Sequence, residues 1–212
     1  MKHVNIFLIA LLIALFIFYE KAALSRLLGE HYLKQGLSYI KDDRRVWATE
    51  PVEKSLSYQR ALRLMSRSIL ENPYFSKGYF EYAELLQEIA KDPGLRISLG
   101  TKDASSLLDA ARIKYTEAIK REPVNAIYHQ RLGDVYYRLG DDKEAEREFD
   151  NAVLLDPQNA SIHFYLSKYF FIKNKDEDFL YHINKAISLG GGGEIINFLK
   201  SIKREDLIPK SK

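Results

Sequence analysis

The stretch AIYHQRLGDVYYRLGDDKEAEREFDNAVLLDPQN, residues 126–159, is the most informative part of this chain about its fold class. The positions that carry its pattern are Leu132, Gly133, Tyr136, Gly140, Ala145, Phe149, Ala152 and Pro157. The small residues among them let two antiparallel helices approach closely, and the aromatic residues fill the space between neighbouring helix pairs. The stretch therefore predicts a tightly packed pair of helices.

Three prolines mark the boundaries between helical segments. Pro73, Pro123 and Pro157 are spaced by 50 and 34 residues, and each precedes a new helical pattern. A proline has a fixed φ and no amide hydrogen, so it closes one helix and opens the next at little cost. A spacing of 34 residues is the period of the tetratricopeptide repeat (TPR), and residues 126–159 resemble a full repeat of that family. A generic helical hairpin is the alternative interpretation.

The same register extends along the rest of the chain. We expect a TPR domain at 22–193, made of units 22–75 with an insertion at 37–56, 76–125 with an insertion at 91–106, 126–159 and 160–193. The last unit is degenerate, because Phe179 stands where alanine is usual and Gly191 where proline is usual. An amphipathic capping helix at 194–204 and a tail at 205–212 complete the prediction.

An apolar segment precedes the repeats. Residues 4–19, VNIFLIALLIALFIFY, are apolar except for Asn5 and are followed by Glu20 and Lys21. We expect residues 1–21 to form an uncleaved transmembrane anchor that contacts the lipid bilayer through residues 4–19. A cleaved signal peptide and a buried core helix are the alternatives.

The flanking charges bear on the orientation of this anchor. Lys21, Arg26 and Lys34 outnumber Lys2, which favours a cytoplasmic domain. A short basic tail, however, resembles the start of a bacterial signal anchor, which exports the domain behind it. We expect a single-pass protein of the bacterial inner membrane with a periplasmic domain, and the cytoplasmic orientation stays open. The predicted fold is all-α: an N-terminal transmembrane helix, a TPR α-solenoid of about four helix pairs and a C-terminal capping helix.

The resemblance also implies a binding surface. TPR proteins bind peptides on a concave surface lined by the first helix of each pair. The matching positions here are Lys77, Phe80, Glu84 and Gln87 in the second unit, Ile127, Gln130, Asp134, Tyr137 and Arg138 in the third, and Phe164, Lys168 and Phe171 in the fourth. Packing of the phenylalanines against the capping helix or each other is the alternative. The lysine and asparagine clamp of chaperone-binding members is absent.

The first insertion holds Trp47, the only tryptophan of the chain. Tryptophan suits an interface anchor or a membrane-surface contact, so we expect Trp47 to contribute to partner binding. Packing onto the first helix pair is the alternative.

No chemistry is apparent in the sequence. The chain has no cysteine, and its 32 basic and 29 acidic residues are scattered, which predicts no nucleic-acid binding. Gly190 to Gly193 lack the lysine that follows a phosphate-binding loop, and His129 and His163 have too few companions for a metal site. We therefore expect no cofactor, no metal and no catalytic residue.

These observations predict a membrane-anchored scaffold or assembly factor that binds protein partners, themselves integral or peripheral membrane proteins. A permanent accessory subunit of a larger membrane complex is one alternative. An enzyme with an unrecognised site is the other.

Overall fold

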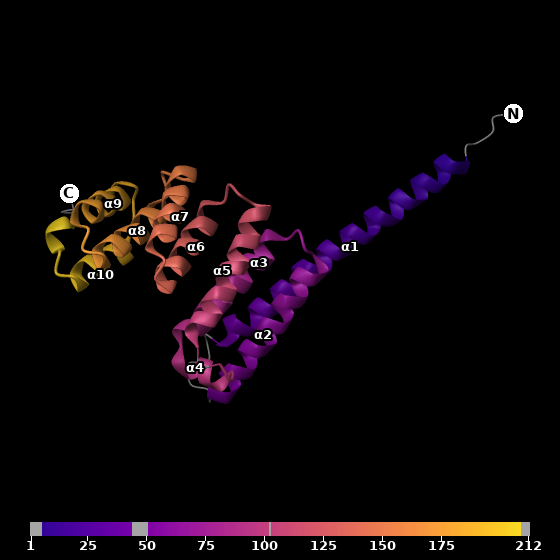
Figure 1. The fold of residues 1–212 in the computed structure, drawn as a ribbon, viewed down its shortest axis with the longest axis horizontal. Helices are drawn as coiled ribbons and strands as arrows, with labels where there is room; N and C mark the ends of the chain where they lie inside the picture. Colours follow the sequence, from indigo (N-terminus) through magenta and orange to yellow (C-terminus); the bar gives the residue numbers. More distant parts are fainter. Residues whose placement is uncertain (1–5, 44–50, 102, 209–212) are drawn as a thin grey trace. The chain divides into compact units, whose positions relative to one another are not determined.

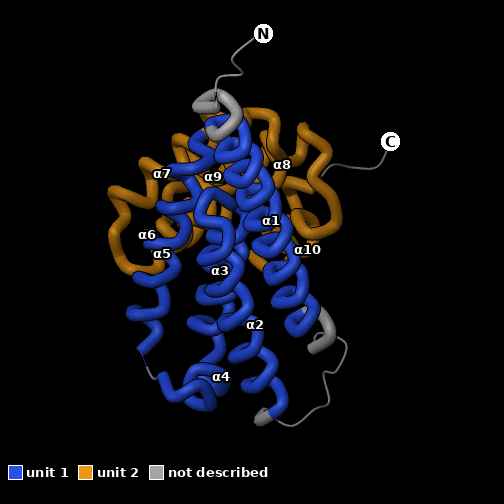
Figure 2. The backbone as a smooth tube through the Cα atoms, turned by 90° about the vertical axis from the view of Figure 1, so that its right-hand side faces the viewer, with its two compact units in different colours: residues 1–123 blue, residues 124–212 orange. Residues whose placement is uncertain are grey.

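The computed structural model describes the backbone of residues 6–43, 51–101 and 103–208, and within these ranges the side chains of residues 11–40, 53–101 and 103–208. The secondary structure of these residues is helical. The chain divides into two compact units, Met1–Pro123 and Val124–Lys212, drawn in blue and orange in Figure 2.

Unit 1 contains α1 (Ile6–Asp43), α2 (Pro51–Glu71), α3 (Ser76–Lys91), α4 (Pro93–Ser98) and α5 (Ala104–Arg121). Helix α1 packs against α2 and helix α3 against α5, each pair antiparallel (Figure 1). The apolar core joins both pairs and α4. Its buried members are Leu33, Ile40, Tyr58, Ala61, Met65, Leu85, Ile89 and Leu95.

Unit 2 contains α6 (Ala126–Leu139), α7 (Asp142–Leu155), α8 (Ala160–Ile172), α9 (Asp176–Ser188) and α10 (Gly193–Ser201), followed by a single 3₁₀ turn at Glu205–Leu207. Helix α6 pairs with α7 and α8 with α9. Helix α10 covers the second pair through Ile195 and Leu199, which are buried with Phe164, Phe179 and Ile183.

Burial repeats with the predicted register. In each of the four pairs, the second helix presents three fully buried residues at equivalent positions to the first helix. These are Ala61, Met65 and Ser68 in α2, Ala111, Tyr115 and Ala118 in α5, Ala145, Phe149 and Ala152 in α7, and Phe179, Ile183 and Ala186 in α9, none more than 1% exposed. The prediction of all-α helical repeats of the TPR type is confirmed.

Two glycines permit the close helix approach. A Cβ added at Gly133 would lie 2.6 Å from the ring of Phe149, and one added at Gly29 would lie 2.6 Å from the Cβ of Asn72. Only glycine avoids these overlaps. Gly140 ends α6 with φ of 85°, a left-handed conformation that glycine adopts without strain.

The segments expected as turn insertions are partly helical. Residues 37–43 continue α1 and residues 51–56 begin α2, so the first helix pair is longer than the others. The second segment holds α4, whose N-terminus is capped by Asp92: its carboxylate accepts a 2.9 Å hydrogen bond from the Leu95 amide. Lys54 of α2 pairs with the same carboxylate at 2.8 Å and holds α4 against the first pair.

The prediction of a transmembrane helix is wrong. Within the described ranges, no helix combines the length and the apolar character needed to cross a bilayer. Helix α1 is apolar from Ile6 to Tyr19, which covers about 21 Å at 1.5 Å per residue, short of a hydrocarbon core of about 30 Å. Glu20 and Lys21 then interrupt it. The predicted location as a single-pass inner-membrane protein is wrong for the same reason, and Val4 and Asn5 of the predicted anchor lie outside the described residues.

Candidate functional site

The predicted binding residues lie on the first helices of three pairs. Lys77, Phe80, Glu84 and Gln87 are on α3 of unit 1, Gln130, Asp134, Tyr137 and Arg138 are on α6, and Phe164, Lys168 and Phe171 are on α8 of unit 2. Trp47 lies outside the described residues.

The residues on α3 mostly serve the packing of unit 1. Phe80 contacts the ring of Tyr115 edge-on at 5.7 Å between centroids, and the Tyr115 hydroxyl donates a hydrogen bond to Glu84. Gln87 is 1% exposed. Of the four, only Lys77 is well exposed. This part of the predicted surface therefore offers little to a partner.

A buried carboxylate organises the residues on α6 and α8. Asp134 is 3% exposed, accepts a 2.8 Å charged hydrogen bond from Arg138 Nε and also bonds the Tyr165 hydroxyl. Burial, and then the negative charge of Asp134, raise the pKa of Tyr165, so its hydroxyl stays protonated and donates. Asp134 itself is closed to a partner, whereas it fixes Arg138 at the surface.

Tyr137 belongs to an aromatic contact between α6 and α8. Its ring meets that of Tyr169 edge-on at 5.2 Å, and Lys173 lies 5.1 Å from its centroid. Tyr169 also packs against Phe149 at 5.0 Å. Burial first, and then the charge of Glu146, raise the pKa of Tyr169. Gln130 is 5% exposed, so it too is closed to a partner.

Helix α8 presents a continuous surface stripe. Ser161, Phe164, Lys168 and Phe171 succeed each other at intervals of three and four residues and so share one side of the helix. We refer to these four residues as the α8 stripe. The Lys168 ammonium lies 4.6 Å from the Phe164 centroid and 5.1 Å from that of Tyr165, which are cation–π distances.

The stripe is supported from α10 and α9. Phe198 of α10 contacts Phe164 at 5.6 Å and Phe171 at 5.9 Å, and Phe171 also packs on Phe179 of α9 at 5.5 Å. Phe164 is 9% exposed, whereas Phe171 is 37% exposed. Both interpretations of the phenylalanines therefore hold in part: Phe164 packs against the capping helix, and Phe171 retains accessible surface.

A small pocket opens at the start of the stripe. It has a volume of about 130 Å³ and is lined by Ala160, Ser161, Phe164, Gly191, Gly192, Gly193, Glu194 and Ile195. The glycine turn leaves it open, because a Cβ at Gly192 or Gly193 would meet nothing within 4 Å. The pocket is large enough for one apolar side chain.

His129 and His163, which occupy equivalent positions in consecutive repeats, have different partners. His129 Nδ1 lies 2.7 Å from Glu148, and His163 Nδ1 lies 2.9 Å from His182 Nδ1. Among the described residues, no three histidine or carboxylate side chains are close enough to bind a metal ion. Sequence reasoning missed Tyr165, His182 and Phe198. The 34-residue period relates His182 to Glu148, and this signal pointed to the contact with His163.

Comparisons with known proteins agree with this architecture. Residues 126–159 match the tetratricopeptide repeat family. The human antiviral innate immune response effector IFIT1 is 21% identical over 173 residues, or 76% of this chain and 36% of IFIT1. The chain thus spans about a third of the length of that curated relative.

Two solved structures share the fold. A monomeric IFIT1 mutant with Gppp-AAAA superposes with a TM-score of 0.58 at 18% identity, covering 74% of this chain and 38% of that one. MamA from Desulfovibrio magneticus RS-1 superposes with a TM-score of 0.50 at 19% identity, covering 80% of this chain and 94% of MamA. At these identities the likeness shows the fold alone, which is a helical repeat of the TPR type.

Proposed function

We propose that this protein is a scaffold that acts by binding a segment of a protein partner, and that the α8 stripe of unit 2 is the binding surface. The observation that carries the proposal is the combination on one helix side of a partly exposed phenylalanine, a lysine held over two rings and an open pocket. Folds of helical repeats expose such surfaces for protein–protein interaction.

The geometry favours a partner with two chemical features. Lys168 and the nearby Arg138 supply positive charge, so the segment carries a carboxylate. Phe171 and the pocket beside Phe164 supply apolar surface, so the segment also carries an apolar or aromatic side chain. Aromatic anchors beside a charged group are the typical composition of a binding hot spot.

A selection from displayed random peptides tests this proposal on the full chain. We expect enrichment of peptides in which an acidic residue stands near an apolar or aromatic one. Lys168→Glu should weaken binding of those peptides by about tenfold or more, because it replaces attraction by repulsion.

The matched control is Lys143→Glu. Lys143 is an exposed lysine on α7, away from the stripe, so its reversal changes the net charge equally and should leave binding intact. Enrichment without acidic residues, or equal losses for both variants, would refute the proposal.

A further inference from the structure

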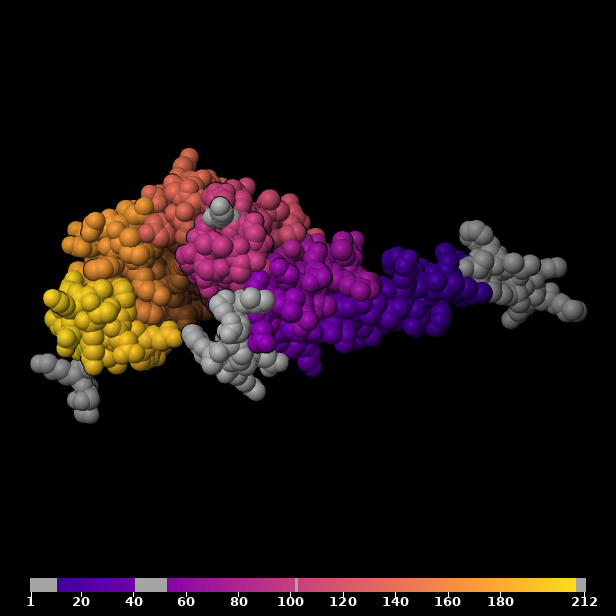
Figure 3. Space-filling view, turned by 90° about the horizontal axis from the view of Figure 1, so that it is seen from below, coloured from indigo at the N-terminus to yellow at the C-terminus, as the bar shows by residue number. Residues whose placement is uncertain are grey.

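Helix α1 extends well beyond the helix it packs against. The Ser25 hydroxyl donates a hydrogen bond to the backbone carbonyl of Glu71, the last residue of α2. The part of α1 before Ser25 therefore projects past the end of α2, as Figure 1 shows. We call residues 11–24 the α1 overhang. In the space-filling view of Figure 3 it stands clear as the indigo end of unit 1.

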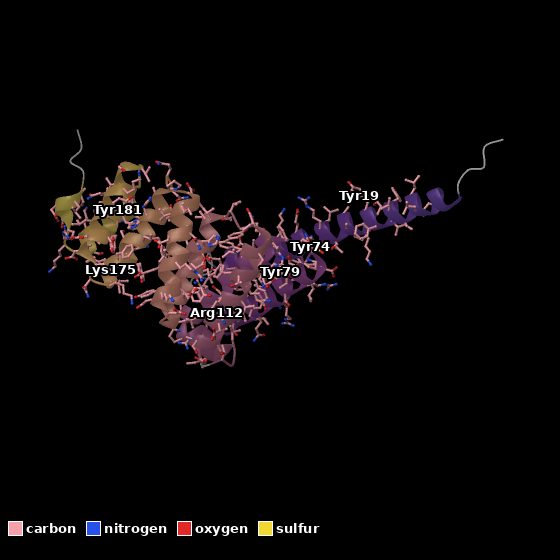
Figure 4. The ribbon with its side chains drawn as sticks, turned by 45° about the horizontal axis from the view of Figure 1, so that its top comes forward. Tyr19, Tyr74, Tyr79, Arg112, Lys175 and Tyr181 are labelled. Carbon is pink, nitrogen blue, oxygen red and sulfur yellow. The ribbon has the colours of Figure 1, made fainter. Side chains whose placement is uncertain are left out.

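The α1 overhang exposes much apolar surface. Between Leu11 and Tyr19, eight large apolar side chains are 47–72% exposed, and Leu24 is 57% exposed. Tyr74, in the turn after α2, is 88% exposed (Figure 4). At about 100 Å² for each side chain, the overhang offers roughly 800 Å², the area that one partner contributes to a stable dimer. A patch of this size marks an interaction site.

The seam that α1 uses against α2 continues into the overhang. Beyond Ser25, Gly29 faces Ser68 and Asn72, and Gly36 faces Ala61 and Met65. Counting backwards from Ser25 by alternate three and four residues gives Ala22, Phe18, Leu15 and Leu11. This is the heptad spacing of a helix–helix seam. The same side of α1 thus packs on an antiparallel helix over part of its length and runs on as an apolar seam without one.

We propose that the occupant of this seam is the α1 overhang of a second copy, lying antiparallel to the first. The continuing seam calls for an antiparallel helix in line with α2, and the second overhang has the required length and apolar character. Leu11 and Ser25 are 14 residues apart, so in the symmetric pair Phe18 lies on the two-fold axis. Leu11 of each copy then reaches the base of the other overhang, where Tyr74 is exposed. This contact involves unit 1 and is independent of the α8 stripe.

Sedimentation of the full chain over a range of concentrations tests the association. We expect a monomer–dimer equilibrium that Phe18→Glu weakens about a hundredfold, because the dimer would bury two unpaired charges against each other. The matched control is Leu154→Glu, a leucine on α7 that is 80% exposed and lies outside the seam. It should dimerise like the wild type. Phe18 is 72% exposed, so its replacement leaves the fold intact, which circular dichroism verifies.

Cysteine crosslinking tests the arrangement, since the chain has no cysteine of its own. Phe18→Cys should form a disulfide with itself across the two-fold axis. Leu11→Cys should not, but it should crosslink to Tyr74→Cys when the two variants are mixed. A monomer at all concentrations, self-crosslinking of Leu11→Cys, or binding to phosphatidylcholine vesicles in place of self-association would overturn the proposal.

Discussion

The buried pair His163 and His182 should make unit 2 sensitive to acid. His182 is 8% exposed, and its ring stacks on Phe170 at 5.3 Å with an angle of 19°. His163 Nε2 lies 3.2 Å from the Pro157 carbonyl, so it carries the hydrogen and donates. His163 Nδ1 is then the acceptor for the Nδ1–H of His182. This arrangement requires both rings to be neutral.

Burial, and then the charge of His163, lower the pKa of His182 from 6.5 to about 4. Burial likewise lowers the pKa of His163. The charged groups around the pair are Asp156 before α8 and Asp178 and Lys185 on α9. Because the folded pKa of His182 lies below the unfolded value, the unfolded chain binds the proton more tightly. Stability is therefore complete above pH 6.5 and is lost as the pH falls towards 4. A shift of this size corresponds to about 3 kcal/mol.

Replacing His182 by phenylalanine keeps a ring against Phe170 and removes the titrating group. Hydrogen exchange of the α9 amides, corrected for intrinsic rates, gives the free energy of opening at each pH. Between pH 7 and pH 4.5, the wild type should lose about 2 to 3 kcal/mol more than His182→Phe. His31→Phe, at an exposed position on α1, should behave as the wild type. Equal losses in the wild type and in His182→Phe would show that the buried pair is not the source of the acid sensitivity.

Three further substitutions test the packing of unit 2, each by chemical denaturation of the full chain. Gly133→Ala should destabilise by about 1 to 3 kcal/mol, because its Cβ would lie 2.6 Å from the Phe149 ring; an unchanged midpoint would show that the helices separate easily. Phe149→Ala should cost about 3 to 5 kcal/mol, since the ring is 1% exposed, and a loss below about 1 kcal/mol would contradict its place in the core. Asn159→Ala should cost about 1 kcal/mol by removing the cap that accepts hydrogen bonds from the Ser161 and Ile162 amides. Asn184→Ala, exposed within α9, is its control and should cost nothing.

The repeat was predictable because its signal is local. Small residues such as Ala145 and Ala152, spaced by a full period from their equivalents, report the close approach of two helices within one unit. A period also tells which side of a helix faces inward. It predicted α6, α7, α8 and the helix that covers the last pair. The length of the first pair was not predictable from it, because residues 37–43 simply continue α1 without a glycine or proline to end it.

The binding surface was predicted less well, because register places a residue on a side of a helix but does not say what else packs there. Asp134 and Gln130 occupy positions expected to be accessible and are buried, while Glu84 is engaged by Tyr115 from the next helix. The apolar N-terminal segment misled for a different reason. Hydropathy identified a segment that seeks to be covered, but not by what, and its length falls short of a bilayer span.

Photocrosslinking in cells tests most directly whether the α8 stripe binds a protein partner. A photoreactive residue at position 171 should give one dominant protein adduct, and that adduct should disappear when Lys168→Glu is added. The same residue at position 154, on the exposed side of α7 in the same unit, should not give it. Absence of an adduct at position 171, or the same adducts at both positions, would contradict the assignment of the α8 stripe as the binding surface.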